Sequence, residues 1–221
     1  MIELRGVELE QPLELALAFL RAYGEPEPTS SPRSFDEADL RFANRGGARI
    51  SAAQISAILE RRRKIERALR DIDPDTSLLA PKSRLPWATL TQLFDAFGGI
   101  SGVGFAKMTK ALHPKRRALI PILDSVVQAY LDPEPDGSFG ERATALVRTY
   151  KREVDSNRRS LRELQRALAR EGYRLTEVRI LDILIWSAVT AGAGGEAQRS
   201  PAAESARAIT ARATTGATAA E

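Results

Sequence analysis

The stretch from Gly98 to Val127, GGISGVGFAKMTKALHPKRRALIPILDSVV, determines how the rest of the chain is interpreted. Gly102 and Gly104 flank Val103, and a segment with the character of a helix follows directly. Glycine lacks a Cβ, so the backbone can turn tightly there. The free N–H groups at the start of the next helix can then bind one phosphate. The stretch therefore predicts a phosphate-binding hairpin, with a tight connection that binds nothing as the alternative.

Basic residues follow the hairpin. Lys107 and Lys110 lie about one helical turn apart, so they are expected to reach neighbouring phosphates as point charges. Val103 is expected to pack inward and fix the angle between the two helices. Lys115 and Arg116 belong to a basic run that is expected to contact phosphate, with a solvated loop as the alternative. The predicted DNA-backbone contacts are Gly102, Val103, Gly104, Lys107, Lys110, Lys115 and Arg116.

The same region resembles a known superfamily. The matching positions are Leu93-Phe94, Ile100 to Gly104, Met108, Leu112 and Ile120 to Ser125. Together they resemble the endonuclease III-like superfamily of helix-hairpin-helix DNA glycosylases, over roughly residues 87–130, under a quarter of the chain. The resemblance implies a DNA partner, a role in DNA repair, and Asp124 as the catalytic carboxylate. Residues 120–127, IPILDSVV, also resemble a bacterial family of unknown function.

The chain departs from the superfamily pattern at several positions. The lysine of the lyase members has its counterpart at Ala106, and Lys107 next to it faces about 100° away on a helix. Met108 replaces a residue that is often small, and Val126 replaces a histidine. The cluster-binding cysteines are absent. These departures predict a glycosylase without lyase activity.

Two interpretations of Asp124 stay open. An aspartate immediately before a helix such as SVVQAYL is among the best N-caps. A carboxylate can also stabilise an oxocarbenium-like sugar, or orient a water, while a base leaves. The two roles are compatible, because a capping aspartate is held rigidly.

The remainder of the sequence predicts helices. Apolar residues recur at helical spacing in 12–24, 51–72, 85–99, 139–172 and 176–190, with a break near Asp155–Asn157. No alternation of strands and helices is present. We therefore expect an all-α, multi-helix fold in one domain over 1–190, with the hairpin and its following helix at 93–130. The Ala/Gly/Ser/Thr-rich segment 191–221 is expected to be a disordered tail.

Composition narrows the chemistry. The 221 residues include no cysteine and one histidine, His113, which is expected to close a helix. This excludes disulfides, thiolate metal sites and a cysteine nucleophile, and we expect neither a metal nor a cofactor. No segment approaches the roughly 18 apolar residues of a membrane span, and the acidic start is unlike a signal peptide. A cytoplasmic protein is expected.

Three functions fit the sequence. The first is a DNA glycosylase-like enzyme that acts through Asp124. The second is a DNA-binding module without chemistry, and the third is a small helical protein with no nucleic-acid partner. The net charge of +4 is too small to choose among them. The target base, the oligomeric state and the role of the basic residues Arg61 to Arg70 stay open.

Overall fold

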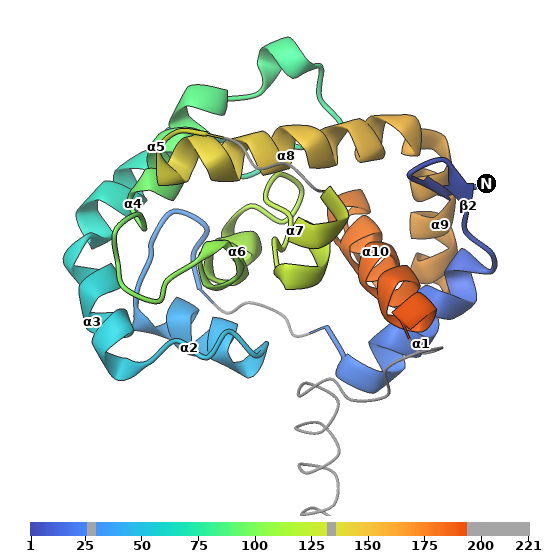
Figure 1. Ribbon diagram of the computed structural model, residues 1–221, viewed down its shortest axis with the longest axis horizontal. Helices are drawn as coiled ribbons and strands as arrows, with labels where there is room; N and C mark the ends of the chain where they lie inside the picture. The colour runs from blue at the N-terminus through green and yellow to red at the C-terminus, as the bar shows by residue number, and fades with distance from the viewer. Residues whose placement is uncertain (26–29, 132–135, 194–221) are drawn as a thin grey trace, which may run out of the picture. The chain divides into compact units, whose positions relative to one another are not determined.

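The structure is a computed structural model that describes residues 1–25, 30–131 and 136–193. The chain divides into two units, Met1–Ser187 and Ala188–Glu221, and each is described by itself. The fold is all-α, as predicted (Figure 1). The only strands in the described ranges are β1 (Glu3–Leu4) and β2 (Val7–Glu8), an antiparallel pair.

The helices of the first half are short. They are α1 (Pro12–Tyr23), α2 (Glu37–Arg45), α3 (Ala52–Glu60), α4 (Arg62–Arg70) and α5 (Trp87–Asp95), with the 3-10 turn η1 (Lys82–Arg84) before α5. Sequence predicted one helix over 51–72, but Arg61 separates α3 from α4. The Arg61 guanidinium donates to the carbonyls of Ala96 and Gly98 just after α5. This contact, 35 residues away along the chain, is a tertiary interaction that helical periodicity does not report.

The second half contains α6 (Phe105–Leu112), η2 (His113–Lys115), α7 (Ser125–Leu131), α8 (Phe139–Ser156), α9 (Arg158–Arg170) and α10 (Glu177–Ala193). The predicted break near Asp155–Asn157 is confirmed, because α8 ends and α9 begins at Asn157. The predicted tail begins within α10, which continues to Ala193. Residues 194–221 lie outside the described residues.

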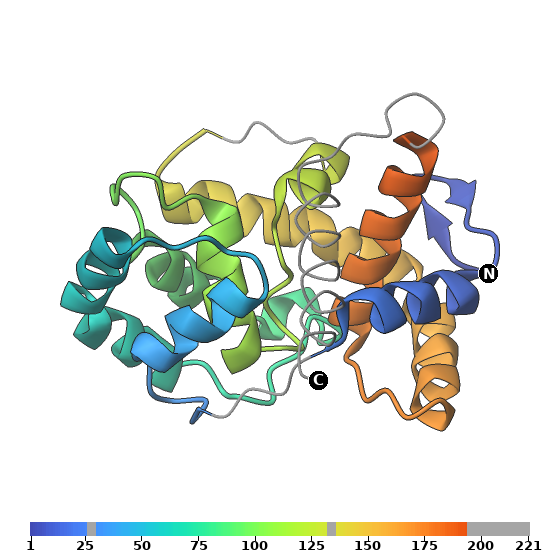
Figure 2. The same ribbon diagram turned by 90° about the horizontal axis from the view of Figure 1, so that it is seen from below.

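Helix α8 packs against α5, and α6 and α7 lie beside it (Figures 1 and 2). Gly140 allows the closest approach, since a Cβ there would lie 2.2 Å from the Thr91 carbonyl oxygen. The Asp95 carboxylate accepts a bond from the Gly140 N–H at 2.6 Å and so stabilises the positive end of α8. The end of α5, where the hairpin starts, is therefore fixed by α4 and α8 together.

Helix α10 contributes strongly to the apolar core. Its residues Ile180, Leu181, Ile183, Leu184 and Ile185 are fully buried. No helix among the described residues is long and apolar enough to cross a membrane.

Candidate nucleic-acid interface and the Asp124 site

The hairpin between α5 and α6 turns on two glycines with different roles. Gly102 has a φ of 71°, in the left-handed region that favours glycine, and the Val103 N–H donates to the Ile100 carbonyl at 3.0 Å. Val103 is buried, as predicted. Gly104 has a φ of −94° and is the N-cap of α6, where no side chain caps the helix. A Cβ at Gly104 would meet nothing within 4 Å, so the space beside the start of α6 is open at this glycine.

Gln54 of α3 joins the hairpin to a second helix terminus. Its Nε2 donates to the Ser101 carbonyl at 3.0 Å, and its Oε1 accepts bonds from the Ser51 N–H and the Lys107 ammonium. A Cβ on Gly102 would lie 2.5 Å from this Nε2. The amide therefore fixes the hairpin and Lys107 in one arrangement. The sequence analysis did not identify Gln54.

Lys107 and Lys110 both point from α6 toward α2 and α3. Lys107 donates to Gln54 at 2.8 Å, and Lys110 donates to the Gly46 carbonyl at 3.0 Å. Burial lowers the pKa of Lys110, whereas the nearby Asp124 carboxyl opposes that change. Each ammonium has three donors, so donors are left for another acceptor.

The segment Arg45–Arg49, which begins at the last residue of α2, contacts α6 through the bond from Lys110 to Gly46 and carries two exposed arginines, Arg45 and Arg49. Arg49 has a φ of 54°, a strained conformation for a residue other than glycine. Asn44 holds the loop, since its amide donates to the Ile50 carbonyl and accepts from the Ile50 N–H. The sequence analysis missed Arg45 and Arg49 as part of the site.

The sequence feature that could have identified Arg45 and Arg49 is the absence of acidic residues around them. None occurs between Asp39 and Glu60, or between Asp95 and Asp124, in a chain with 29 acidic residues. The structure brings these two acid-free stretches together through Lys110 and Gln54. The combined surface is therefore electropositive, although the net charge of the chain is small.

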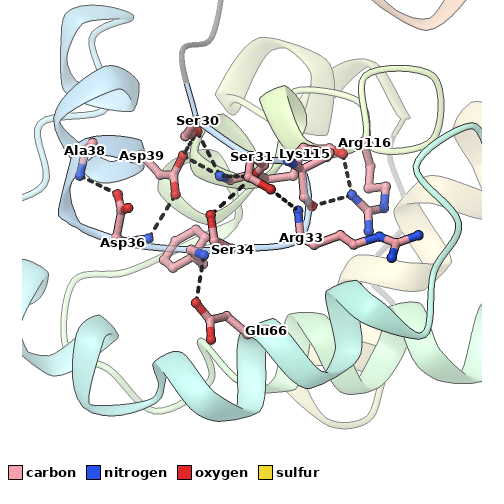
Figure 3. A network of polar contacts seen from close by, with 12 residues as sticks. Ser30, Ser31, Arg33, Ser34, Asp36, Ala38, Asp39, Glu66, Lys115 and Arg116 are labelled. Carbon is pink, nitrogen blue, oxygen red and sulfur yellow. Dashed lines mark hydrogen bonds and ion pairs between the residues drawn. The ribbon is translucent and has the colours of Figure 1, made fainter.

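The prediction that Lys115 and Arg116 contact phosphate is wrong, because both side chains are buried (Figure 3). The Lys115 ammonium lies 2.7 Å from Asp39 Oδ1 and donates to the Ser30 hydroxyl and the Ser31 carbonyl. It thus uses all three donors inside the protein. Asp39 also accepts from the Asp36 N–H as part of the α2 capping box.

Arg116 is fully buried and has no carboxylate among its hydrogen-bond partners in the described residues. Its guanidinium donates to the carbonyls of Pro32, Lys115, Leu69 and Ile72. Leu69 lies at the C-terminal end of α4, where the helix dipole favours a cation. Lys115 and Arg116 therefore hold the segment before α2 against α4.

Asp124 caps α7, as one of the two interpretations predicts. Its Oδ1 accepts the Val127 N–H at 2.9 Å, and its carbonyl accepts the Gln128 N–H. The side chain is partly exposed, and its field acts on both Lys110 of α6 and Asp182 of α10. Asp124 is therefore accessible from solvent and rigidly held.

The segment 120–124 that leads into Asp124 is held by side chains. His113 bonds the Ile120 carbonyl at 2.6 Å, and the Thr109 hydroxyl accepts the Leu123 N–H at 3.0 Å. Asp182 Oδ2 accepts the Ile122 N–H at 3.1 Å. Because Thr109 belongs to α6, the hairpin helix itself helps to place Asp124. His113 also closes α6, as predicted.

Two buried groups around this segment titrate far from their usual range. Burial raises the pKa of Asp182 to about 8, with Asp124 adding to the effect and Arg179, the Ile122 N–H and Tyr150 opposing it. Burial lowers the pKa of His113 to about 3, with Arg179 adding to the effect. The sequence analysis missed Asp182, although an acidic residue in the most apolar helix is itself a signal.

Two hollows described in the structure lie away from Asp124 and the hairpin. One is an open groove of about 550 Å³ along the α8–α9 junction. The other, of about 20 Å³, is bordered by His113, Arg117 and Arg179. The groove is lined by Asp155, Ser156, Arg158, Arg159, Arg162, Glu163 and Arg166. No group of three or more metal-ligating side chains occurs in the described ranges.

Comparison with known proteins places the chain by family. No significant match is found among curated proteins or among solved structures. Residues 18–189 match the model of a family described as "Family of unknown function (DUF6308)". The match includes the hairpin, the Arg45–Arg49 loop, Asp124 and Asp182, and it extends over most of the chain. The chain therefore belongs to this family, DUF6308.

Proposed function

We propose that this protein binds the phosphate backbone of DNA through the hairpin and the adjacent Arg45–Arg49 loop. The observation that carries the proposal is the start of α6, where no side chain caps the helix at Gly104 and the space beside this glycine is open. Helix N-termini of this kind bind phosphate. Lys107 and Lys110 lie on the same helix, and Arg45 and Arg49 lie beside it. The resemblance to helix-hairpin-helix DNA glycosylases supports the same partner.

Gly104 allows a sharp test, because its φ is compatible with any residue and its Cβ would meet nothing. Gly104→Asp places a carboxylate at the uncapped start of α6, where it caps the helix and repels phosphate. We expect the variant to keep or gain stability, by about 1 kcal/mol. We expect its affinity for duplex DNA to fall at least about tenfold, or about 1.4 kcal/mol.

The controls are Gly104→Ala and Gly104→Asn. Alanine leaves the N–H groups free, so its affinity should match that of the wild type. Asparagine caps the helix without adding charge, so its affinity should be intermediate. Affinity is measured by fluorescence anisotropy over a series of salt concentrations, because phosphate contacts make the affinity fall as salt rises. Equal affinities for Gly104→Asp and wild type, or an affinity insensitive to salt, would contradict the proposal.

A second function is favoured by the exposure and the rigid placement of Asp124. We propose that a carboxylate at this position stabilises the sugar as a base leaves, in a glycosylase without lyase activity. Ala106 at the usual lysine position agrees with the absence of a Schiff-base step. Alternatives are a DNA-binding module without chemistry and a helical protein with no nucleic-acid partner.

Asp124→Asn separates these functions, because asparagine is an equally good N-cap. The variant should therefore keep its melting temperature and its affinity for DNA. Formation of abasic sites on a panel of duplexes with damaged and modified bases should be lost. A wild-type protein that binds DNA but is inert on the whole panel would leave only the binding function.

A further inference from the structure

Asp182 is a buried carboxyl near the Asp124 site, and its hydrogen bonds do not explain why an acid is present at this position. Its Oδ2 accepts the Ile122 N–H, but Oδ1 has no hydrogen-bond partner although the residue is only 3% exposed. A buried polar atom without a partner costs about 1–3 kcal/mol. Asparagine would provide the same acceptor without an ionisable group. The presence of a carboxyl here therefore calls for an explanation beyond that one bond.

We propose that Asp182 is a positioning residue for Asp124, because its buried carboxyl accepts the Ile122 N–H and so holds the backbone two residues before Asp124. The importance of this arrangement for catalysis rests on the proposed function of Asp124. The arrangement itself is independent of that function. It depends on the bond from Ile122 to Asp182 and on the burial of the acid.

Burial and the nearby Asp124 favour the protonated form of Asp182, whereas Arg179, the Ile122 N–H and Tyr150 oppose it. The Tyr150 hydroxyl of α8 donates its proton to the Val178 carbonyl at 2.6 Å, so it has no second proton to offer this carboxyl. Arg179, on the same helix, pairs with Glu25 at 2.9 Å and so does not serve Asp182 alone.

Asp124 has the opposite surroundings. It is partly exposed, accepts an N–H at the positive end of α7, and lies within the field of Lys110. If Asp182 ionises, its negative charge acts on the Asp124 carboxyl, and the carboxyl carbon of Asp124 reports this change.

The test uses NMR on the full chain and needs no DNA. The carboxyl carbon of Asp124 is followed by ¹³C titration, and the amides of Ile122 and Val127 are followed by hydrogen exchange. In the wild type, the Asp124 resonance should shift near pH 8, where Asp182 loses its proton. Asp182→Asn should abolish that shift and keep amide protection, because its amide oxygen can still accept the Ile122 N–H.

Asp182→Leu removes the acceptor, so exchange at Ile122 should accelerate about fivefold to tenfold relative to the core, as expected for one lost bond. The matched control is Thr144→Val, which removes a buried hydroxyl bonded to Thr91 and should leave both readouts unchanged. If Asp182→Leu does not fold, the proposal is still tested by comparing the Asp124 titration of the wild type with that of Asp182→Asn.

An Asp124 resonance that does not shift near pH 8, or a shift near pH 8 that persists in Asp182→Asn, would overturn the proposal. Unchanged exchange at Ile122 in a folded Asp182→Leu variant would do the same. These measurements do not involve DNA, so a negative result rejects the positioning role of Asp182 without rejecting the DNA-binding function. Conversely, if the protein does not bind DNA, the positioning role of Asp182 can still be tested.

Discussion

Individual cations in this protein have roles that their residue type does not reveal. Lys107, Arg45 and Arg49 are accessible on the surface formed by the two stretches without acidic residues. Lys115 and Arg116, by contrast, are buried and bonded to other groups of the protein. The difference depends on partners far away in sequence, because Arg116 bonds the Pro32 carbonyl 84 positions earlier. A basic run in a sequence therefore does not distinguish a nucleic-acid contact from an internal clamp.

The buried ion pair gives a prediction at this scale. Asp39→Asn leaves the Lys115 ammonium buried without a carboxylate, and the expected cost is about 3–5 kcal/mol. The matched control is Glu37→Gln on the same helix, whose partner Arg41 is exposed, with an expected cost below about 1 kcal/mol. Urea unfolding measures both free energies. Equal costs for the two variants would show that the buried pair contributes no more than a surface pair.

At the scale of elements, the hairpin is held by three neighbouring helices. Arg61, between α3 and α4, bonds the carbonyls after α5, Gln54 of α3 bonds the hairpin itself, and α8 packs against α5 at Gly140. These contacts with the core therefore hold the hairpin rigid. A preorganised loop of this kind loses little conformational entropy when it binds a ligand.

Gly140 gives the prediction for this scale. A Cβ at this position would overlap the Thr91 carbonyl, so Gly140→Ala must push α8 away from α5. We expect a loss of about 1–3 kcal/mol, in spite of the better helix propensity of alanine. Gly104→Ala is the control, since its Cβ meets nothing. Melting temperatures compare the two, and a Gly140→Ala protein as stable as Gly104→Ala would show that the helices can separate freely.

Sequence patterns predicted the elements better than their contacts. Helical periodicity located most helices and the break at Asn157, because burial of one face imposes that spacing. The break at Arg61 and the burial of Arg116 were missed, because both depend on carbonyl groups from distant segments. Within the site, the glycines, Val103 and the cap at Asp124 follow from local chemistry. Gln54 and Asp182 act across the fold, so spacing along the chain does not reveal them.

For the whole molecule, two buried groups determine how stability depends on pH. Asp182 keeps its proton in the folded state up to about pH 8, whereas an unfolded aspartate loses it near pH 4. The unfolded state binds fewer protons in that interval, so stability falls as pH rises. His113 stays neutral in the folded state down to about pH 3, whereas unfolded histidine is protonated below about 6.5. Its contribution therefore falls as pH decreases.

Between about pH 4 and 6.5, the contributions of Asp182 and His113 to stability change with pH in opposite directions. From about pH 6.5 to about pH 8, only the contribution of Asp182 changes. We expect the free energy of unfolding to be nearly level in the first interval and to decrease by about 2 kcal/mol in the second, at about 1.4 kcal/mol per pKa unit. Asp182→Asn should remove the second decrease. Urea unfolding at a series of pH values measures the profile, and a wild type as stable at pH 8 as at pH 6 would contradict it.

The contact between Gln54 and Gly102 has a consequence for how relatives of this protein diverge. A side chain at position 102 would need both a left-handed backbone and the space that the Gln54 amide fills. Replacing Gln54 by a shorter residue frees that space, but releases Ser101 and Lys107 from their partner. The two positions are therefore expected to co-vary in evolution, so that a chain which loses the glycine loses the glutamine as well.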